Sequence, residues 1–108
     1  MGLFDFLSKP DINQGVEDFL KASDAVLLDV RTPEEYKEGH IPGSLNIPLQ
    51  TIDKVESVVE NIDAPLYVYC HSGARSSRAA SRLHEIGYTN VNNIGGIAAY
   101  TGEVEKIT

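Results

Sequence analysis

Two apolar runs constrain the fold of this chain more than any other feature of its sequence. The first is AVLLDV, residues 25–30, and the second is LYVYC, residues 66–70. Such runs, rich in aliphatic and aromatic residues, are typical of strands that are covered on both faces of a sheet. Helical patterns lie between and beyond them, and strands that alternate with helices predict an α/β fold with a parallel sheet.

Helical and weaker strand signals fill the rest of the chain. Thr32 and Pro33 predict the cap and the first turn of a short helix that Gly39 ends. Apolar side chains recur at helical spacing in three other segments: 13–23 (Val16, Phe19, Leu20), 52–62 (Ile52, Val55, Val59, Ile62, with Pro65 as the stop) and 76–86 (Ala79, Ala80, Leu83, Ile86, closed by Gly87). We also expect brief strands at 45–48 and 89–94 and a helical finish over 97–108.

Length and charge limit the organisation and the partners. A chain of 108 residues can bury one hydrophobic core, and we assign residues 1–10 to a short apolar leader and 11–108 to a single domain. The 9 Lys and Arg residues against 16 Asp and Glu residues give a net charge of −7. This charge repels a phosphate backbone and argues against nucleic acid as a partner.

The single cysteine and the absence of long apolar runs predict a cytoplasmic protein, and the small size without an evident coiled coil predicts a monomer. One cysteine forms no intramolecular disulfide, which fits a reducing compartment. No apolar run approaches the length of a membrane span, and the N-terminus lacks the pattern of a secretory signal, so we expect no membrane partner. The apolar side chains of the leader either fold back on the domain or offer a surface to a protein partner.

Cys70 is the first candidate for chemistry. Cys70 is the last residue of the second apolar run, and Asp29 lies at the carboxyl end of the first. Ligands of parallel sheets bind at the carboxyl ends of the strands. Gly73 lets the following turn bend so that its N–H groups converge on one point. A helix that begins near Ser76 adds its positive end to the same point, as an anion site requires.

The charge pattern around Cys70 favours a reactive thiolate. From residue 64 to residue 84 the chain has no acidic residue, whereas Arg75, Arg78 and Arg82 all fall in this segment. Positive neighbours and a helix N-terminus both stabilise the thiolate, which is the nucleophilic form. The guanidinium of Arg75 is placed to hold an anionic substrate through two hydrogen bonds.

Other interpretations compete with this one. A free cysteine is often inert and buried, but the Arg-rich glycine turn without acidic residues favours function here. Cys70 and His71 are adjacent and lack the spacing of metal ligands, so we expect no metal. Asp29 and Arg31 form either an ion pair that supports the loop from the neighbouring strand or a surface pair of little energetic weight, and we favour the first.

Three stretches, in this order, resemble the single-domain rhodanese-like sulfurtransferases: DVRTPEEYKEGHIPGSLNIP (29–48), YVYCHSGARSSRAASRL (67–83) and NIGGIAAY (93–100). The resemblance implies a central parallel five-stranded sheet flanked by helices on both faces. It also implies that Cys70 is the nucleophile that carries a persulfide. The active-site loop would consist of His71, Ser72, Gly73, Ala74 and Arg75, with support from Asp29, Arg31 and Ser76.

The resemblance further implies a sulfurtransferase that needs no metal or organic cofactor. Cys70 would take a sulfane sulfur from a small anionic donor, thiosulfate or another persulfide-type compound, and pass it to a thiophilic acceptor such as cyanide, a thiol or a carrier protein. The related phosphatases have a loop one residue longer than Cys70–Arg75. Two alternatives stay open: a phosphatase or arsenate reductase that uses this loop, and a sulfur-relay or protein-interaction module with low turnover of small molecules.

Overall fold

The computed structural model describes residues 10–108, so all but the last residue of the expected leader lies outside the described residues. The elements are, in chain order, α2 (Ile12–Lys21), β1 (Val26–Asp29), α3 (Pro33–Glu38), β2 (Ser44–Asn46), the 3-10 helix η1 (Leu49–Ser57), β3 (Leu66–Cys70), α4 (Ala74–Glu85), β4 (Val91–Gly96) and the 3-10 helix η2 (Ile97–Ala99). No helix among these residues is long and apolar enough to span a membrane.

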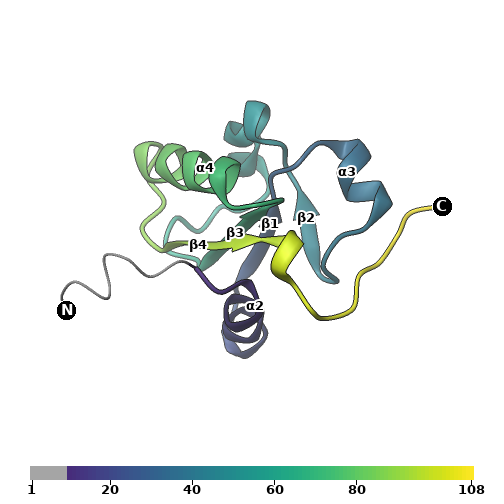
Figure 1. The fold of residues 1–108 in the computed structure, drawn as a ribbon. Helices are drawn as coiled ribbons and strands as arrows, with labels where there is room; N and C mark the ends of the chain where they lie inside the picture. Colours follow the sequence, from purple (N-terminus) through teal and green to yellow (C-terminus); the bar gives the residue numbers. More distant parts are fainter. Residues whose placement is uncertain (1–9) are drawn as a thin grey trace.

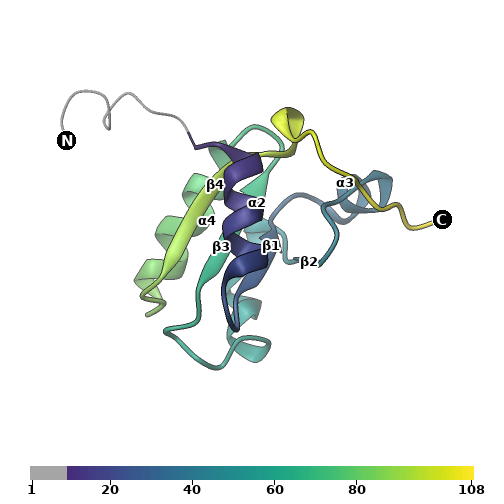
Figure 2. The same cartoon turned by 90° about the horizontal axis from the view of Figure 1, so that it is seen from below.

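The strands form one parallel sheet in the order β2-β1-β3-β4. Helix α4 lies on one face of the sheet and α2 on the other (Figure 1), and Figure 2, which views the molecule from below, shows α2 in front of the sheet and roughly along its strands. The predicted α/β fold, with helices on both faces of a parallel sheet, is therefore confirmed. Both apolar runs form central strands, which explains why neither alternates with polar residues.

The expected fifth strand is not found, because the described residues form four strands. The helical finish expected over 97–108 is also wrong, because only Ile97–Ala99 is helical. The chain beyond η2 runs past α3 (Figure 2) and makes one isolated antiparallel bridge, between His40 and Glu105. The Asn13 side chain accepts hydrogen bonds from the Thr101 backbone and hydroxyl, which fixes an extended path where a helix was expected.

The core has two parts, one on each face of the sheet. Neighbouring residues of a strand point to opposite faces, so Leu28 and Val68 pack with α4 and η1, whereas Leu27 and Tyr69 pack with α2. Helix α2 lies close to the sheet because Gly15 has no side chain: a Cβ there would lie 2.4 Å from Ile94 Cβ.

Two predicted helical faces are shorter than expected. Leu20 in α2 is 71% exposed, although it was expected on the buried face. The stripe over 52–62 is buried only as far as Val59, since the 3-10 helix ends at Ser57 and Ile62 is 50% exposed. The turn after Val59 is closed by hydrogen bonds to the Asn61 backbone and side chain, and these interrupt the helical pattern.

Candidate active site

Asp29 and Cys70 lie at the carboxyl edge of the sheet, at the ends of the neighbouring strands β1 and β3, as the sequence predicts. Asp29 is the last residue of β1 and pairs in register with Tyr69, which directly precedes Cys70 at the end of β3. Both side chains are buried, with Asp29 at 0% and Cys70 at 1% exposure. The hydrogen-bond partners of the sulfur come from the loop after β3 and the first turn of α4. Asp29 lies on the sheet face of Leu27 and Tyr69, whereas Cys70 lies on the opposite face with Leu28 and Val68.

The loop after Cys70 turns tightly into α4. Gly73 has a φ of 104°, which is a left-handed conformation that glycine adopts without strain, and it caps α4. The Gly73 N–H lies 3.0 Å from the Cys70 sulfur. Helix α4 begins at Ala74, two residues before the expected start at Ser76, so its positive end directly adjoins the sulfur.

Opposing effects act on the pKa of Cys70, and the result is a lowered value. Burial raises it, but hydrogen bonds from the Ser76 hydroxyl and from the backbone N–H groups of Ser76, Gly73 and Ser72 favour the thiolate and outweigh burial. A thiol that is easily ionised and held by several N–H groups is the expected state of a nucleophilic cysteine.

Ser76 and Asn93 form a polar contact beneath the sulfur. Ser76 is fully buried, and its Oγ lies 3.5 Å from Cys70 Sγ and 2.7 Å from Asn93 Oδ1. Asn93 belongs to β4 and was not among the residues singled out from the sequence. Its sequence signal is its place as the first residue of NIGGIAAY, the third stretch that resembles the rhodanese-like sulfurtransferases.

Arg75 is held by an acidic partner. Its two terminal nitrogens donate to the two oxygens of Glu35, at 2.8 and 3.0 Å. These contacts, together with a hydrogen bond from Thr32, lower the pKa of Glu35 to about 2 although partial burial opposes the shift. The predicted contact of Arg75 with an anionic substrate stays a prediction, since in the structure the fork of the guanidinium is directed at Glu35. Glu35 was not predicted as a site residue, since the sequence around Thr32 and Pro33 indicated only the start of a helix.

Asp29 and Arg31 form a buried ion pair rather than a surface pair. The guanidinium of Arg31 donates to both carboxylate oxygens of Asp29, with the shortest distance 2.7 Å. Arg31 also donates to the Gly39 carbonyl at 2.7 Å. The Asn46 side chain bonds the backbone carbonyls of Asp29 and Arg31, so the pair is fixed from both sides.

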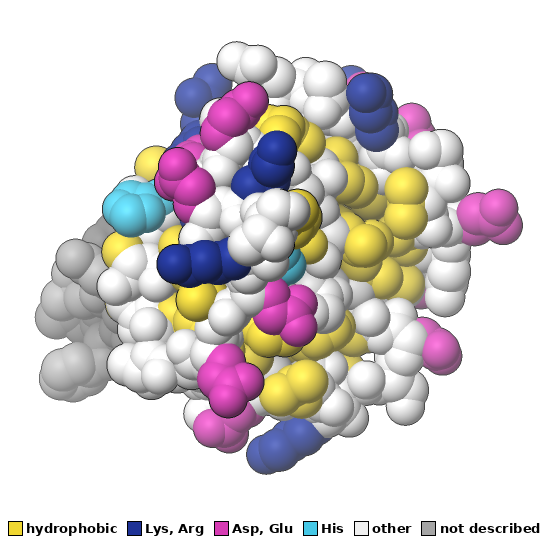
Figure 3. Space-filling view, turned by 90° about the vertical axis from the view of Figure 1, so that its right-hand side faces the viewer, with side chains coloured by type: hydrophobic (Ala, Val, Ile, Leu, Met, Phe, Trp, Pro, Cys, Tyr) yellow, Lys and Arg dark blue, Asp and Glu magenta, His cyan; other side chains and the backbone are white. Residues whose placement is uncertain are grey.

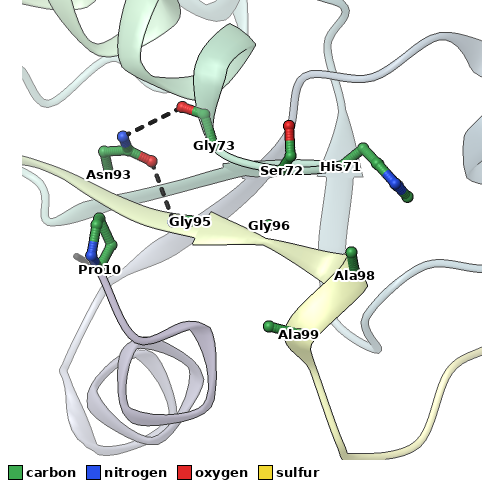
Figure 4. A pocket seen from close by; sticks show the side chains of 9 residues that line it. All are labelled: Pro10, His71, Ser72, Gly73, Asn93, Gly95, Gly96, Ala98 and Ala99. Atoms are coloured by element: carbon green, nitrogen blue, oxygen red, sulfur yellow. Dashed lines mark hydrogen bonds between the residues drawn. The ribbon is translucent and has the colours of Figure 1, made fainter.

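The remaining loop residues lie at the surface. His71, Ser72 and Ala74 are exposed, and Figure 4 shows the His71 ring pointing away from the neighbouring strand β4. The backbone of the loop is nonetheless fixed, because the His71 carbonyl accepts a hydrogen bond from Ala98 N–H at 3.0 Å. A Cβ on Gly96 would lie 2.1 Å from that carbonyl, so β4 supports the loop from directly below.

Two hollows flank the loop. One, of about 430 Å³, lies between the loop, Pro10 and the end of β4 (Figure 4). The other is a groove of about 960 Å³ whose lining includes Arg31, Thr51, Lys54, Arg75 and Arg78. Within residues 10–108, Lys54 and Arg78 form no ion pair. On the face that Figure 3 shows, acidic and basic side chains lie close to one another, with apolar areas between and beside them.

The surplus of positive charge expected near Cys70 is smaller than the sequence indicates. Arg75 is paired with Glu35, and Arg82 is paired with Asp53 and Glu85. Of the three arginines of this segment only Arg78 forms no ion pair within the described residues. No three His, Cys, Asp or Glu side chains of residues 10–108 cluster in a way that could hold a metal ion.

Comparisons with known proteins find relatives for most of the chain. Residues 13–103 match the family described as Rhodanese-like domain. The thiosulfate sulfurtransferase PspE of Escherichia coli (strain K12) is 39% identical over 71 residues, which are 65% of this chain and 68% of PspE. The putative sulfur carrier protein YrkF of Bacillus subtilis (strain 168) is 40% identical over 80 residues, which are 73% of this chain but only 43% of YrkF.

A solved structure described as rhodanese with anions from E. coli superposes with a TM-score of 0.71 at 35% identity and covers 76% of this chain and 98% of its own. The match over residues 13–103 includes every strand, the Cys70 loop and the buried pair at the end of β1. This chain therefore belongs to the family of rhodanese-like domains.

Proposed function

We propose that this protein is a sulfurtransferase that carries a sulfane sulfur on Cys70. The observation that supports this most is the position of the Cys70 sulfur: it accepts from the Gly73 N–H at 3.0 Å at the N-terminus of α4, and its pKa is lowered. The name of the relative PspE supports thiosulfate as a donor, and the family membership supports sulfur transfer as the reaction class.

The first step loads the sulfur. The Cys70 thiolate attacks the outer sulfur of thiosulfate, and a bond forms between Sγ and that sulfur. The S–S bond of the donor breaks, and its electron pair leaves with sulfite. The loop N–H groups and the positive end of α4 stabilise the negative charge that the new persulfide carries on its outer sulfur.

The second step unloads the sulfur. A thiolate or cyanide forms a bond to the outer sulfur, and the electron pair of the persulfide bond returns to Cys70 as the thiolate. Cys70 is the only cysteine of the chain, so the persulfide meets no second thiol in the same molecule that would convert it to a disulfide.

The residues around Cys70 would act through position and charge. The backbone N–H groups of His71, Ser72, Gly73, Ala74 and Arg75 would form the cradle for the outer sulfur. The Asp29–Arg31 pair would fix the end of β1 beneath the loop. Arg78 and Lys54 in the groove would attract an anionic donor, because neither forms an ion pair within the described residues, whereas Arg31 and Arg75 are paired with Asp29 and Glu35.

A sulfur relay to or from a partner protein is the second candidate. A groove of about 960 Å³ is far larger than thiosulfate requires, and the relative YrkF is named as a putative sulfur carrier protein. In this case the small-molecule turnover would be low, but the Cys70 persulfide would be the same.

The proposal is tested with a turnover assay that uses thiosulfate as the donor and cyanide as the acceptor. We expect thiocyanate from the wild-type protein and none from Cys70→Ser. Ser77→Ala, which changes an exposed serine of the same helix, serves as the matched control and should keep full activity. Hydrolysis of an aryl phosphate that depends on Cys70, without thiocyanate formation, would instead establish the phosphatase alternative.

A further inference from the structure

The Asn93 side chain lies beneath the candidate nucleophile and makes three hydrogen bonds. Its Oδ1 accepts from the Ser76 hydroxyl at 2.7 Å and from the Gly95 N–H at 3.1 Å, and its Nδ2 donates to the Gly73 carbonyl at 3.5 Å. Figure 4 shows the bonds to Gly73 and Gly95. One amide thus joins β4 to the cap of α4 and to the hydroxyl that contacts the sulfur.

The Ser76 hydroxyl has one proton and more than one acceptor. Besides Asn93 Oδ1, the carbonyls of Gly73 and Gly95 lie at 3.1 and 3.4 Å, and Cys70 Sγ lies at 3.5 Å. When Cys70 is a thiol, its S–H donates to Ser76 Oγ, and the hydroxyl proton is free to bond Asn93. When Cys70 is a thiolate, the sulfur only accepts, so it competes with Asn93 for that proton.

We propose that Asn93 is a positioning residue that holds the Ser76 hydroxyl proton while Cys70 is protonated or carries sulfur, and gives it up when Cys70 is a thiolate. The Gly95 N–H keeps Asn93 Oδ1 satisfied in either arrangement, so the hydroxyl can rotate without leaving a buried acceptor unpaired.

The direction of the Ser76 hydroxyl follows the charge on Cys70 in each step of sulfur transfer. This part of the inference rests on the proposed function. In loading, Cys70 forms a bond to the outer sulfur, its negative charge leaves Sγ, and the hydroxyl turns to Asn93. In unloading, the acceptor takes the outer sulfur, the electron pair of the S–S bond returns to Sγ, and the hydroxyl turns to the new thiolate. No proton is transferred, because only the O–H bond changes direction.

The charged side chains near Cys70 do not take the role that we propose for Asn93. His71 lies on the loop itself and is exposed. Arg75 on α4 is paired with Glu35 of α3, and Asp29 and Arg31 at the end of β1 are paired with each other. Strand β4, VNNIGG, contributes no titratable side chain. Asn93 therefore acts on the sulfur through the hydroxyl of Ser76 rather than through a charge.

The test is the rate of alkylation of Cys70 by iodoacetamide as a function of pH, which requires no sulfur transfer. The variants are Asn93→Ala, Ser76→Ala and the double variant. Asn92→Ala is the matched control, because Asn92 is in the same strand but bonds Leu66 and Asn90 instead. We expect Ser76→Ala to raise the midpoint by about one pH unit, since the thiolate loses a donor.

Asn93→Ala should lower the midpoint, by less than about one pH unit, because the thiol form loses its best acceptor for the hydroxyl while the thiolate form loses nothing. The same change should have no effect in the Ser76→Ala background, and Asn92→Ala should leave the midpoint unchanged. An equal shift in both backgrounds, or no shift from Asn93→Ala, would overturn the proposal.

If Asn93→Ala does not fold, Asn93→Asp is compared with Ser76→Ala/Asn93→Asp. The carboxylate accepts the hydroxyl proton more strongly, so the midpoint should rise more when Ser76 is present than when it is absent. Equal rises would show that Asn93 does not act through Ser76. The alkylation rates do not depend on sulfur transfer, so they can contradict the role of Asn93 while the turnover assay still gives thiocyanate. Failure of this inference is therefore distinct from failure of the proposed function.

Discussion

Arg75 in the first turn of α4 and Glu35 in α3 are joined by two parallel hydrogen bonds of 2.8 and 3.0 Å, although 40 positions separate them in the sequence. The same Glu35 also completes a capping box with Thr32. The start of the helix that follows the Cys70 loop is therefore fixed to the start of α3. A displacement of α3 would therefore also displace the first turn of α4, which follows the Cys70 loop.

Replacing Glu35 by Gln should destabilise the fold at neutral pH, by about 1 kcal/mol or less for a partly exposed pair. The folded-state pKa of Glu35, about 2, lies below the ordinary value of 4.5, so its contribution is present above that value and is lost as the pH falls toward about 2. Urea unfolding at several pH values measures this. The difference between wild type and variant should shrink on acidification.

The neighbour Glu34 is the control for that experiment. It is exposed and forms no ion pair within residues 10–108. Glu34→Gln should change stability less than Glu35→Gln at pH 7. Equal effects of the two variants would show that the contact with Arg75 contributes nothing.

Asp29→Asn should be strongly destabilising, by about 3 kcal/mol, because it leaves the Arg31 charge buried without its partner. Asp53→Asn is the comparison, since Asp53 makes a similar bidentate contact with Arg82 at the surface. Thermal unfolding of both variants should show a large shift for Asp29 and a much smaller one for Asp53. Similar shifts would contradict the importance of burial.

Gly96→Ala should distort the Cys70 loop. The added Cβ would lie 2.1 Å from the His71 carbonyl oxygen and 2.5 Å from Ser72 Cα, and both are backbone atoms that cannot move alone. We expect a loss of about 1–3 kcal/mol of stability and a changed alkylation rate of Cys70. Gly39→Ala is the control, because its nearest neighbour would be at 3.8 Å, and it should leave the alkylation rate unchanged.

Tyr69→Phe should cost about 1–3 kcal/mol, because the Tyr69 hydroxyl is the acceptor for the buried Ile41 N–H at 3.0 Å. The loss would leave that N–H without a partner beneath the active-site edge. Tyr67 lies two residues earlier in β3, and its hydroxyl makes no hydrogen bond within the described residues. Tyr67→Phe should therefore leave the free energy of unfolding nearly unchanged in denaturant unfolding. Equal costs would contradict the role of this bond.

Local signals predicted much of the fold. The two apolar runs are the central strands because burial on both faces requires apolar side chains in succession, and Thr32-Pro33 starts α3 through contacts within one turn. The helix expected over 97–108 failed because its path depends on Asn13, which is distant in sequence. The stripe at 52–62 was cut short by the turn at Asn61, which periodicity alone does not reveal.

In the candidate site, too, local sequence signals were predictive and contacts between distant segments were not. The positions of Cys70, Gly73 and the Asp29–Arg31 pair were predicted from residues close in sequence and from the rule that parallel strands end at one edge. Glu35 and Asn93 were missed, because each matters through a contact that only the packing of separate elements creates. The roles of His71, Ser72 and Ala74 in catalysis stay predictions.

The most direct test of the central claim is the intact mass of the reduced protein before and after treatment with thiosulfate, beside Cys70→Ser. We predict a gain of one sulfur atom in the wild-type protein, its removal by cyanide and its absence in the variant. If neither thiosulfate nor a small-molecule persulfide adds sulfur to Cys70, the account of Cys70 as a sulfur carrier is contradicted.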